Sequence, residues 1–369
     1  MLQLENCRHR QHRLLGEAER RKLDFAILTN PKTVYYFTGA LVDPSKPQVF
    51  ILSTSGKSLL ITNQEPSQAA VEKVGLYTGY TIERVFNHAT MAAEAAALAR
   101  GFISARPGTA GVEYEFMSLA LAQALDGKKT VDLSPVLNEM RRIKDTDEIE
   151  CIRAAIRMTE AAYGAVKARL EPGMTERQVH NVVYEAMSAF AGTSVHLMGD
   201  FVCGERAVGG GGPATERKIL LGDLFILDLF PVYHAYMCDL TRTFIAGSPS
   251  QLQLEAWAHV RDAHTVVGKI LRPGVRAKHV YEEVRAHLDR FVPLKGSFFH
   301  HAGHGVGMDG WEFPWLIPGS DQLVQEGEVI ACEPALYGKA IQGGLRLERD
   351  YLVEKHGVTP LDSFPMDLR

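Results

Sequence analysis

Two aspartates, each at the edge of an apolar segment, are the first residues whose types and spacing could do chemistry. Asp228 ends the apolar run 224–227, and Asp239 begins an alternating segment, 239–244, eleven residues later. An aspartate buried in an apolar strand is costly unless it is paired or binds a metal ion. We therefore expect paired strands that place the two carboxylates opposite each other. The plainer alternative is a turn aspartate plus a surface pair of Asp239 with Arg242.

Three histidines lie close together further along the chain. His300, His301 and His304 fall within five residues, and glycines surround the last of them in the segment 303–307. Imidazole is a common metal ligand, and glycine allows the backbone to approach a ligand closely. A single histidine would more often be structural, whereas this cluster indicates a metal site.

Two glutamates complete the pattern. Glu333 follows the apolar segment 329–332, and Glu348 lies between the segments 345–347 and 350–353. Each glutamate alone could be a surface charge at the end of a strand. Together with the aspartates and the histidine cluster, they instead predict one site.

The charges of such a site need counterions. One negative charge each on Asp228, Asp239, Glu333 and Glu348 would sum to −4, and gathered carboxylates repel each other and take up protons. Two divalent cations would balance that charge, and with His304 the donor set suits manganese, cobalt, iron or zinc. Two metal ions about 3.5–4 Å apart can share a hydroxide and polarise a carbonyl.

Two domains are expected to hold these residues, because 369 residues exceed an ordinary single domain. Residues 1–140 alternate apolar strands with helical segments, which predicts a mixed α/β domain. The expected helices of this domain are 8–22, 90–100 and 117–125, and the expected strands are 25–29, 49–53 and 58–62.

Residues 141–369 form the second predicted domain. It begins after the charged segment 141–145, which we interpret as a linker. Capping-box patterns at Asp145 and Thr175 begin two successive helices.

The second domain also contains an internal repeat. Residues that end one helix and begin the next recur at an offset of 101, since Leu170, Pro172, Gly173, Val179 and Val183 correspond to Leu271, Pro273, Gly274, Val280 and Val284. A Pro-Gly pair after a helix is common by itself. The constant offset favours a duplicated half-domain, and a site between the halves would draw ligands from both.

The composition favours a soluble globular protein of the cytoplasm. With 46% hydrophobic and 23% charged residues, the chain has no apolar run of membrane-spanning length, and its N-terminal segment has no apolar signal-peptide core. The net charge of −4, without a long basic block, argues against nucleic acid as a partner. Five widely spaced cysteines indicate neither a disulfide framework nor a cysteine zinc site, so a reducing compartment is expected.

These motifs resemble those of the pita-bread metallohydrolases, a family that includes prolidase (Xaa-Pro dipeptidase), aminopeptidase P, methionine aminopeptidase and creatinase. The family has two aspartates eleven residues apart, followed by Thr-Arg-Thr, Gly-His-Gly-x-Gly, Glu-Pro and Arg-x-Glu motifs. In this sequence they match Asp228 and Asp239, Thr241 to Thr243, Gly303 to Gly307, Glu333 with Pro334, and Arg346 with Glu348. The resemblance extends through the segment 142–144 and weakly to 36–39.

The resemblance implies a creatinase-like N-terminal α/β domain, an α+β pita-bread catalytic domain with internal pseudo-two-fold symmetry, and a homodimer. It also implies that two divalent metal ions are held by Asp228, Asp239, His304, Glu333 and Glu348. Glu333 would also pass a proton from the bridging water to the leaving nitrogen. His300 would position the substrate, and Arg346 would orient ligands or bind a substrate carboxylate.

The chain departs from the family at two histidines that contact the substrate in the peptidases. One lies seventeen residues before the first aspartate, where this chain has Gly211, and the other lies seven residues after the metal histidine, where it has Trp311. Loss of one donor to a developing oxyanion typically costs about 10²–10³ in rate. Gly211 could provide backbone N–H groups for an anion, and Trp311 could provide an apolar wall for the substrate. Alternatively, His301, His234 or His196 could replace the lost groups.

Three functions follow as hypotheses. The first is hydrolysis of a C–N bond by a metal-bridging hydroxide, most simply in a dipeptide with proline after the scissile bond. The second, motivated by Gly211 and Trp311, is a non-peptide small-molecule hydrolase, as in creatinase, or a lyase. The third is a catalytically silent binding module, which ranks last because every expected metal ligand is present.

Overall fold

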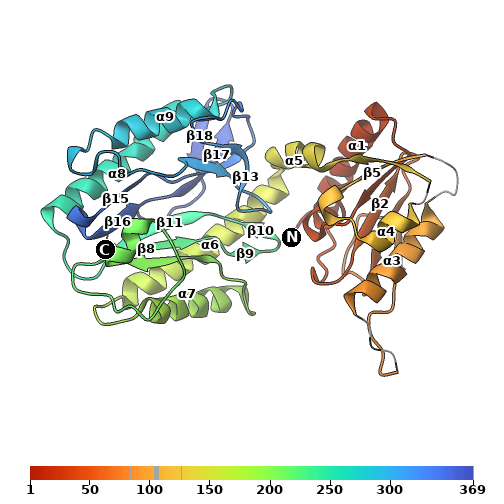
Figure 1. Cartoon of the computed structure of the whole chain (residues 1–369), viewed down its shortest axis with the longest axis horizontal. Coiled ribbons are helices and arrows are strands. Elements are labelled where there is room, and N and C mark those ends of the chain that lie inside the picture. The colour runs from red at the N-terminus through yellow and green to blue at the C-terminus, as the bar shows by residue number, and fades with distance from the viewer. Residues whose placement is uncertain (84, 86, 104–107, 126, 369) are drawn as a thin grey trace. The chain divides into compact units, whose positions relative to one another are not determined.

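The computed structural model describes residues 1–83, 85, 87–103, 108–125 and 127–368. It contains two compact units, Met1–Met140 and Arg141–Arg369, and helices pack against strands in each of them (Figure 1). In the described part of the chain, no helix combines the length and the apolar character needed to cross a membrane.

The N-terminal unit is built on one sheet with the strand order β4-β3-β2-β1-β5-β6. Its strands are β1 Phe25–Leu28, β2 Val49–Ser53, β3 Ser58–Thr62, β4 Lys73–Leu76, β5 Thr109–Val112 and β6 Lys129–Asp132. Its helices are α1 Leu4–Arg20, α2 Pro31–Thr38, α3 His88–Phe102, η1 Tyr114–Phe116, α4 Leu119–Ala124 and α5 Ser134–Arg142. The helices and strands predicted for this unit are confirmed, and their ends shift by a few residues.

One face of this sheet forms the core of the N-terminal unit. Alternate residues of the strands, such as Ile27, Ile51 and Ile61, share a buried cluster with Ala95 and Ala99 of α3. Side chains two residues apart in a strand point to the same face. The small alanine side chains therefore let α3 pack closely on this apolar face.

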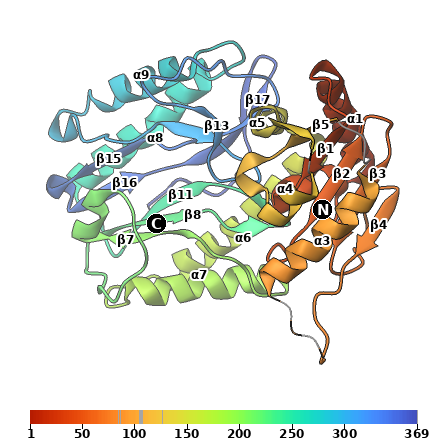
Figure 2. The ribbon, with the colours of Figure 1, turned by 45° about the vertical axis from the view of Figure 1, so that its right-hand side comes forward.

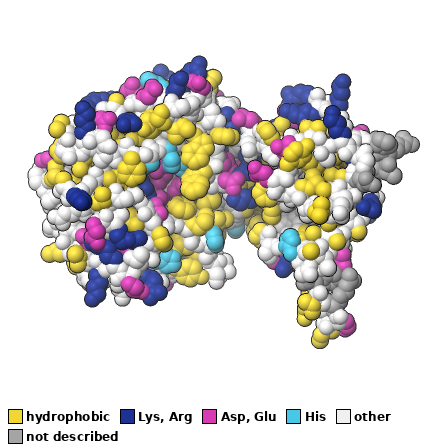
Figure 3. All heavy atoms as spheres, in the orientation of Figure 1, with side chains coloured by type: hydrophobic (Ala, Val, Ile, Leu, Met, Phe, Trp, Pro, Cys, Tyr) yellow, Lys and Arg dark blue, Asp and Glu magenta, His cyan; other side chains and the backbone are white. Residues whose placement is uncertain are grey.

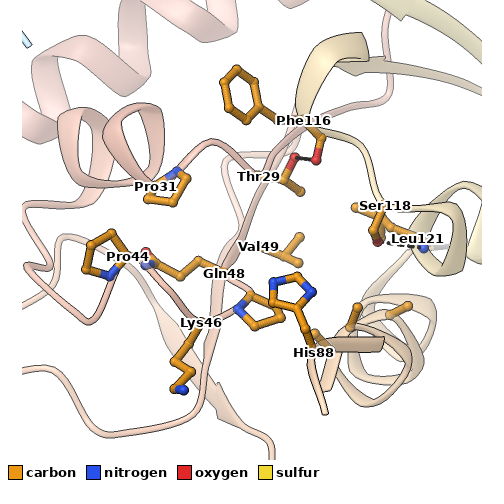
Figure 4. A pocket seen from close by; sticks show the side chains of 14 residues that line it. Thr29, Pro31, Pro44, Lys46, Gln48, Val49, His88, Phe116, Ser118 and Leu121 are labelled. Atoms are coloured by element: carbon orange, nitrogen blue, oxygen red, sulfur yellow. Dashed lines mark hydrogen bonds between the residues drawn. The ribbon is translucent and has the colours of Figure 1, made fainter. Parts of the chain in front are cut away.

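A cavity of about 190 Å³ lies in the N-terminal unit. Figure 4 shows part of its lining, including Thr29, Gln48, His88 and Phe116. Thr29 Oγ1 donates to the Phe116 carbonyl at 2.9 Å, and Gln48 Nε2 donates to the Asp43 carbonyl at 3.1 Å. The described residues that line the cavity include no carboxylate, so this cavity lacks the donor set predicted for the metal site.

The C-terminal unit places its strands between two helix pairs, as Figure 1 and Figure 2 both show. The pairs are α6 Thr146–Arg169 with α7 Glu176–Ala191, and α8 Gln251–Ile270 with α9 Ala277–Leu288. One sheet contains β7 Gly199–Cys203, β8 Leu224–Leu229 and β11 Leu240–Ile245. The other contains β12 Gly303–Gly305, β13 Glu312–Trp315, β14 Val329–Cys332, β17 Arg349–Glu354 and β18 Gly357–Pro360.

Shorter elements complete this unit. Two hairpins are formed by β9 Val232–Tyr233 with β10 Tyr236–Met237, and by β15 Ala335–Gly338 with β16 Gly343–Arg346. The 3₁₀ helices are η2 Gly204–Gly209, η3 Val292–Leu294 and η4 Lys339–Ile341. Apolar residues of α8 and α9, such as Val260 and Val280, share one core cluster with Ile226 of β8 and Ile330 of β14.

The two helix pairs turn in the same way. Gly173, between α6 and α7, has φ +96°, and Gly274, between α8 and α9, has φ +85°. The Gly173 N–H donates to the Ile219 carbonyl at 2.8 Å, and the Gly274 N–H donates to the Val324 carbonyl at 2.9 Å. This shared geometry supports the predicted duplication of a half-domain.

The charged segment 141–145 differs from the predicted linker. The helix α5 continues to Arg142, and the side chains of Arg141, Arg142 and Lys144 are buried. Arg141 and Lys144 both pair with Glu312, whose Oε2 lies 3.0 Å from Lys144 Nζ. The carboxylate partners of these cations lie far along the chain. The local sequence therefore shows only a run of charged residues, which is typical of a solvated segment.

We expect Glu312→Gln to lower the free energy of unfolding of the C-terminal unit by about 3–5 kcal/mol, because it removes the negative charge that pairs with buried Lys144 and leaves Arg141 paired with Asp309 alone. Burial by itself raises the pKa of Glu312. The positive charges of Lys144 and Arg141 together have the larger effect and bring this pKa down to about 2. Since this folded-state pKa is depressed, the stabilisation is complete above the ordinary value of 4.5 and is lost as the pH falls toward 2. Urea unfolding of the unchanged protein and of Glu312→Gln should show a difference in the free energy of unfolding that narrows at acidic pH. Glu326→Gln, at an exposed position, is the control. A difference that stays constant below pH 4.5 would contradict this account.

Candidate metal centre

The two aspartates reach the site from neighbouring antiparallel strands. Asp228 lies near the end of β8 and faces Thr241 of β11 in the register of the pair. Asp239 directly precedes β11, two residues before Thr241, so it is a diagonal neighbour of Asp228 and not its direct partner. Both aspartates are buried. Residues with this diagonal relationship lie on one face of the sheet, close enough for their side chains to share a ligand.

The second sheet supplies the histidine and the first glutamate. His304 is the middle residue of β12, which lies between β13 and β14. Gly303 has φ +151°, and a Cβ atom there would lie 1.9 Å from the Ala331 carbonyl oxygen. Glycine is therefore required beside His304 for β12 to approach β14. Glu333 directly follows β14, and its N–H donates to the Ala302 carbonyl at 3.0 Å.

Glu348 connects the two sheets. It lies between β16 and β17, and its N–H donates to the Thr241 carbonyl at 3.0 Å. Thr241 Oγ1 in turn donates to Glu348 Oε2 at 2.7 Å. This double contact holds the glutamate beside the strand that follows Asp239.

Four of the five predicted ligands fall into two adjoining groups of possible metal donors, and Asp228 is in neither group. Donor atoms of Asp239, His304 and Glu348 all lie within 4.8 Å of one another, and so do donor atoms of His300, His301 and Glu333. His304 Nε2 lies 3.6 Å from Asp239 Oδ2 and 3.7 Å from Glu333 Oε1, which joins the groups. In Figure 3, acidic and histidine side chains are visible in a hollow of the C-terminal unit, bordered by hydrophobic side chains.

Burial and mutual repulsion act on the carboxylates of this site. Burial raises the pKa of Asp239 well above its ordinary value, and the charges of Glu348 and Asp228 raise it further. Burial likewise raises the pKa of Glu348, with Glu333 and Asp228 adding to the effect. For Asp228, burial raises the pKa to about 6 although Arg346 opposes the shift. A cation between these groups would relieve both the burial and the repulsion.

The histidines of the site lower the pKa of Glu333, whereas the carboxylates of the site raise each other's pKa. Burial lowers the pKa of His304 and of His300, so both imidazoles favour the neutral form that a metal ligand needs. Burial raises the pKa of Glu333, but His301 and the two other imidazoles lower it, to about 2. His301 Nδ1 lies 2.8 Å from Glu333 Oε1. Glu333 therefore stays ionised among groups that stabilise its negative charge.

The donor set fits divalent metal ions. Among the described residues, Asp228 Oδ1 and Asp239 Oδ1 are buried oxygens without a hydrogen-bond partner. Buried polar atoms are normally satisfied, so such oxygens call for a ligand. Carboxylate oxygens with one imidazole suit manganese, cobalt, iron or zinc. Asp228, Asp239, His304, Glu333 and Glu348 are the residues that could hold them.

Arg346 lies at the end of β16 and contacts the site through every nitrogen of its guanidinium. Its Nη2 donates to Asp228 Oδ2 at 2.7 Å and to Asp200 Oδ2 at 3.0 Å. Its Nε donates to Thr241 Oγ1 at 3.1 Å, and its Nη1 donates to the Gly210 carbonyl at 3.3 Å. Arg346 is thus bound to the protein on all sides, which leaves little capacity for the substrate carboxylate suggested from the sequence.

The two substituted positions differ in their surroundings. Gly211 lies beside the carboxylate of Asp200, and the neighbouring Gly212 N–H donates to Asp200 Oδ1 at 2.8 Å. The glycine run therefore does present a backbone donor to an anion, and that anion belongs to the protein itself. Trp311 precedes β13 and is 66% exposed. The indole that packs against the site is that of Trp315, 5.3 Å from the His301 ring and 5.5 Å from the His304 ring.

Of the histidines considered as replacements, His301 is the one that contacts a predicted ligand, through Glu333. His234 lies in the turn between β9 and β10 and stacks on Tyr233, with ring centroids 4.1 Å apart. His196 forms an isolated bridge with Val232. His300 lies in the second group, where its Nε2 is 2.8 Å from the Tyr337 hydroxyl.

Several residues of the site were missed by the sequence analysis. Asp200 and Tyr337 had no motif around them, and Trp315 is one of several aromatic residues near the histidine cluster. Asp350 accepts a hydrogen bond from the Asp239 N–H at 3.1 Å while fully buried, and so fixes the backbone at that predicted ligand. The one available signal was that Asp350, like Glu348, is an acid next to apolar residues.

Comparisons with known proteins agree along nearly the whole chain. The model of metallopeptidase family M24 matches residues 150–355, and that of the creatinase/prolidase N-terminal domain matches residues 10–143. An Xaa-Pro dipeptidase of Pyrococcus furiosus is 25% identical over 366 residues, which cover 98% of this chain and 99% of that protein. An Xaa-Pro dipeptidase of Pyrococcus horikoshii is 31% identical over 231 residues, 62% of this chain and 65% of that protein.

Solved structures share the fold. The prolidase from Pyrococcus horikoshii OT3 has a TM-score of 0.82 at 23% identity, covering 98% of this chain and 100% of that one. An Xaa-Pro dipeptidase from Bacillus anthracis has a TM-score of 0.83 at 24% identity, covering 98% and 99% of the respective chains. These likenesses confirm the predicted combination of a creatinase-like α/β domain and a pita-bread catalytic domain.

Proposed function

The chain belongs to metallopeptidase family M24 and is a metal-dependent hydrolase, and from this premise we propose that it hydrolyses dipeptides with proline after the scissile bond. The observation that carries the proposal is one buried cluster containing Asp239, His304 and Glu348 beside Glu333, with aspartate oxygens that have no partner among the described residues. Its relatives named Xaa-Pro dipeptidase support the choice of substrate.

Two divalent ions, of manganese, cobalt, zinc or iron, are proposed for this cluster. Asp228, Asp239, His304, Glu333 and Glu348 would hold them. When bound, such ions supply Lewis acidity toward the substrate carbonyl and lower the pKa of attacking water.

Glu333 is proposed to move the proton. Its ionised carboxylate accepts a proton from the attacking water and delivers it to the leaving nitrogen. His301 Nδ1, at 2.8 Å from Glu333 Oε1, orients that carboxylate. His300 Nε2 and the Tyr337 hydroxyl are 2.8 Å apart, and this linked pair is proposed to position the substrate. The Trp315 ring packs beside those of His301 and His304, with ring centroids 5.3 Å and 5.5 Å apart.

Two further proposals concern the oligomeric state and the cellular location of the protein. A homodimer is proposed, in which the N-terminal domain of one protomer helps to close the active site of its partner. A cytoplasmic location is proposed as well, since the described cysteines are all free and buried, as suits a reducing compartment.

The test is proline release from a panel of Xaa-Pro dipeptides by protein loaded with manganese or cobalt, with metal content measured on the same sample. We expect release that stops after removal of the metal by a chelator and resumes when the metal is restored. Dipeptides with alanine in place of proline serve as matched substrates. If protein with two bound ions per chain releases no proline, the peptidase proposal is wrong, and the non-peptide hydrolase becomes the next candidate.

A further inference from the structure

Asp200 accepts a hydrogen bond from Arg346, which also contacts the predicted ligand Asp228. It is on β7, directly opposite Asp228 of β8 in the strand register, so the two carboxylates are on one face of the sheet. Arg346 Nη2 lies between them, 3.0 Å from Asp200 Oδ2 and 2.7 Å from Asp228 Oδ2. The side chain of Asp200 is 27% exposed, so a ligand in the site can reach it.

Asp200 occupies the space that a side chain at position 211 would need. A Cβ atom built on Gly211 would lie 2.1 Å from Asp200 Oδ2 and 2.6 Å from its Cγ. The carboxylate is held there by Arg346 and by the Gly212 N–H. A hydrogen-bond acceptor therefore occupies the space beside Gly211. Position 211 has to be glycine while Asp200 holds this place, because the side chain of any larger residue would displace the carboxylate.

The Asp200 carboxylate affects the charge that a substrate meets. An ionised aspartate only accepts hydrogen bonds and carries a negative charge. The net charge of the site is thus one unit more negative than it would be with a neutral side chain at position 200. Arg346 carries one positive charge and contacts both Asp200 and Asp228, so the two ionised carboxylates and the guanidinium together keep one net negative charge.

An exposed aromatic wall lies next to the glycine run. Phe299 is 60% exposed, and its ring is 3.1 Å from the position of a Cβ atom on Gly210. It also packs on Tyr337, with ring centroids 4.8 Å apart. An apolar wall beside a carboxylate suits an aliphatic chain that ends in a cation, as in lysine or arginine.

We infer that Asp200 is a specificity-determining residue that selects substrates bearing a cationic side chain, with the stem along Phe299 and the charged end at Asp200. This inference rests on the proposed function, because it assumes that the substrate binds at the same metal centre. Among Xaa-Pro dipeptides, it names those with lysine or arginine before the proline.

The first test measures binding, independently of turnover. Ketomethylene analogues of Lys-Pro and of norleucine-Pro cannot be cleaved and differ in one charge. Calorimetry on the metal-loaded protein should show that the lysine analogue binds about 10- to 100-fold more tightly, as expected for one charge-assisted hydrogen bond. Asp200→Asn should remove most of this preference. Asp321→Asn, which removes an exposed carboxylate from the same unit, should keep it.

Two results would overturn the inference: equal binding of the two analogues by the unchanged protein, or a preference that survives in Asp200→Asn. Hydrolysis of Lys-Pro and norleucine-Pro is then compared on the same samples. If the lysine analogue is preferred but neither dipeptide is cleaved, the peptidase proposal fails while the role of Asp200 stands. If both dipeptides are cleaved equally well and bind equally well, the peptidase proposal stands and the role of Asp200 fails.

A second test uses thermal unfolding of the metal-free protein. Gly211→Ala should lower the melting temperature, since the added methyl group pushes the Asp200 carboxylate away from Arg346 and Gly212. In the background of Asp200→Ala, Gly211→Ala should lower the melting temperature much less, because the Asp200 carboxylate is no longer there to be displaced. Equal effects of Gly211→Ala in the two backgrounds would show that Asp200 does not occupy this space.

Discussion

Glu333→Ala is expected to lower kcat for Xaa-Pro hydrolysis by about 10³-fold, within the range typical for loss of a general acid–base group. Glu333 follows β14 and remains ionised among His300, His301 and His304, and its Oε1 lies 3.7 Å from Nε2 of the predicted ligand His304. Its removal eliminates both a proposed ligand and the proposed proton carrier. Single-turnover measurements with saturating metal would separate the chemical step from metal binding.

Glu333→Gln keeps the shape of the side chain and retains one oxygen as a weak ligand. It should bind metal better than the alanine variant and still be inactive, because an amide cannot accept the proton. Glu354→Gln, at the exposed end of β17, is the matched control and should retain full activity. Near-normal turnover by Glu333→Gln would remove this residue from the proton-transfer role.

Asp239→Asn is expected to have opposite effects on the metal-free and metal-loaded protein. Without metal, burial together with Glu348 and Asp228 opposes ionisation of Asp239, so a neutral amide should raise the melting temperature or leave it unchanged. With metal, the variant should lose affinity by more than the roughly 10–100-fold that removal of an outer-shell partner costs. Binding at 100 times the Kd would stabilise the unchanged protein by about 2.7 kcal/mol, and most of that gain should vanish.

The measurement is thermal unfolding with and without manganese, with bound metal determined on the same samples. Asp262→Asn, an exposed carboxylate on α8 paired with Arg261, controls for the change in net charge. A variant of Asp239 that is less stable without metal and equally stabilised by manganese would mean that the carboxylate has a structural role instead.

The elements that carry the predicted ligands could be found from the sequence, for local reasons. The apolar runs that precede Asp228 and Glu333 are short and continuous, which suits buried strands, and β8 and β14 form there. The helix that begins after Asp145 follows from its capping box with Glu148, which the structure contains. Such signals depend on neighbours within a few residues, so one sequence is enough to show them.

The sequence by itself indicated which carboxylates and histidines the fold would gather, because each carboxylate adjoins an apolar segment and the histidines lie within five residues. Only the tertiary structure decided what surrounds them. Asp200 meets Arg346 across 146 residues of chain, and Lys144 meets Glu312 across 168. Nothing local in the sequence encodes such pairs, because they depend on which strands lie side by side and which faces they share. For the same reason, the absence of a side chain at Gly211 acquired a meaning only when Asp200 was found in its place.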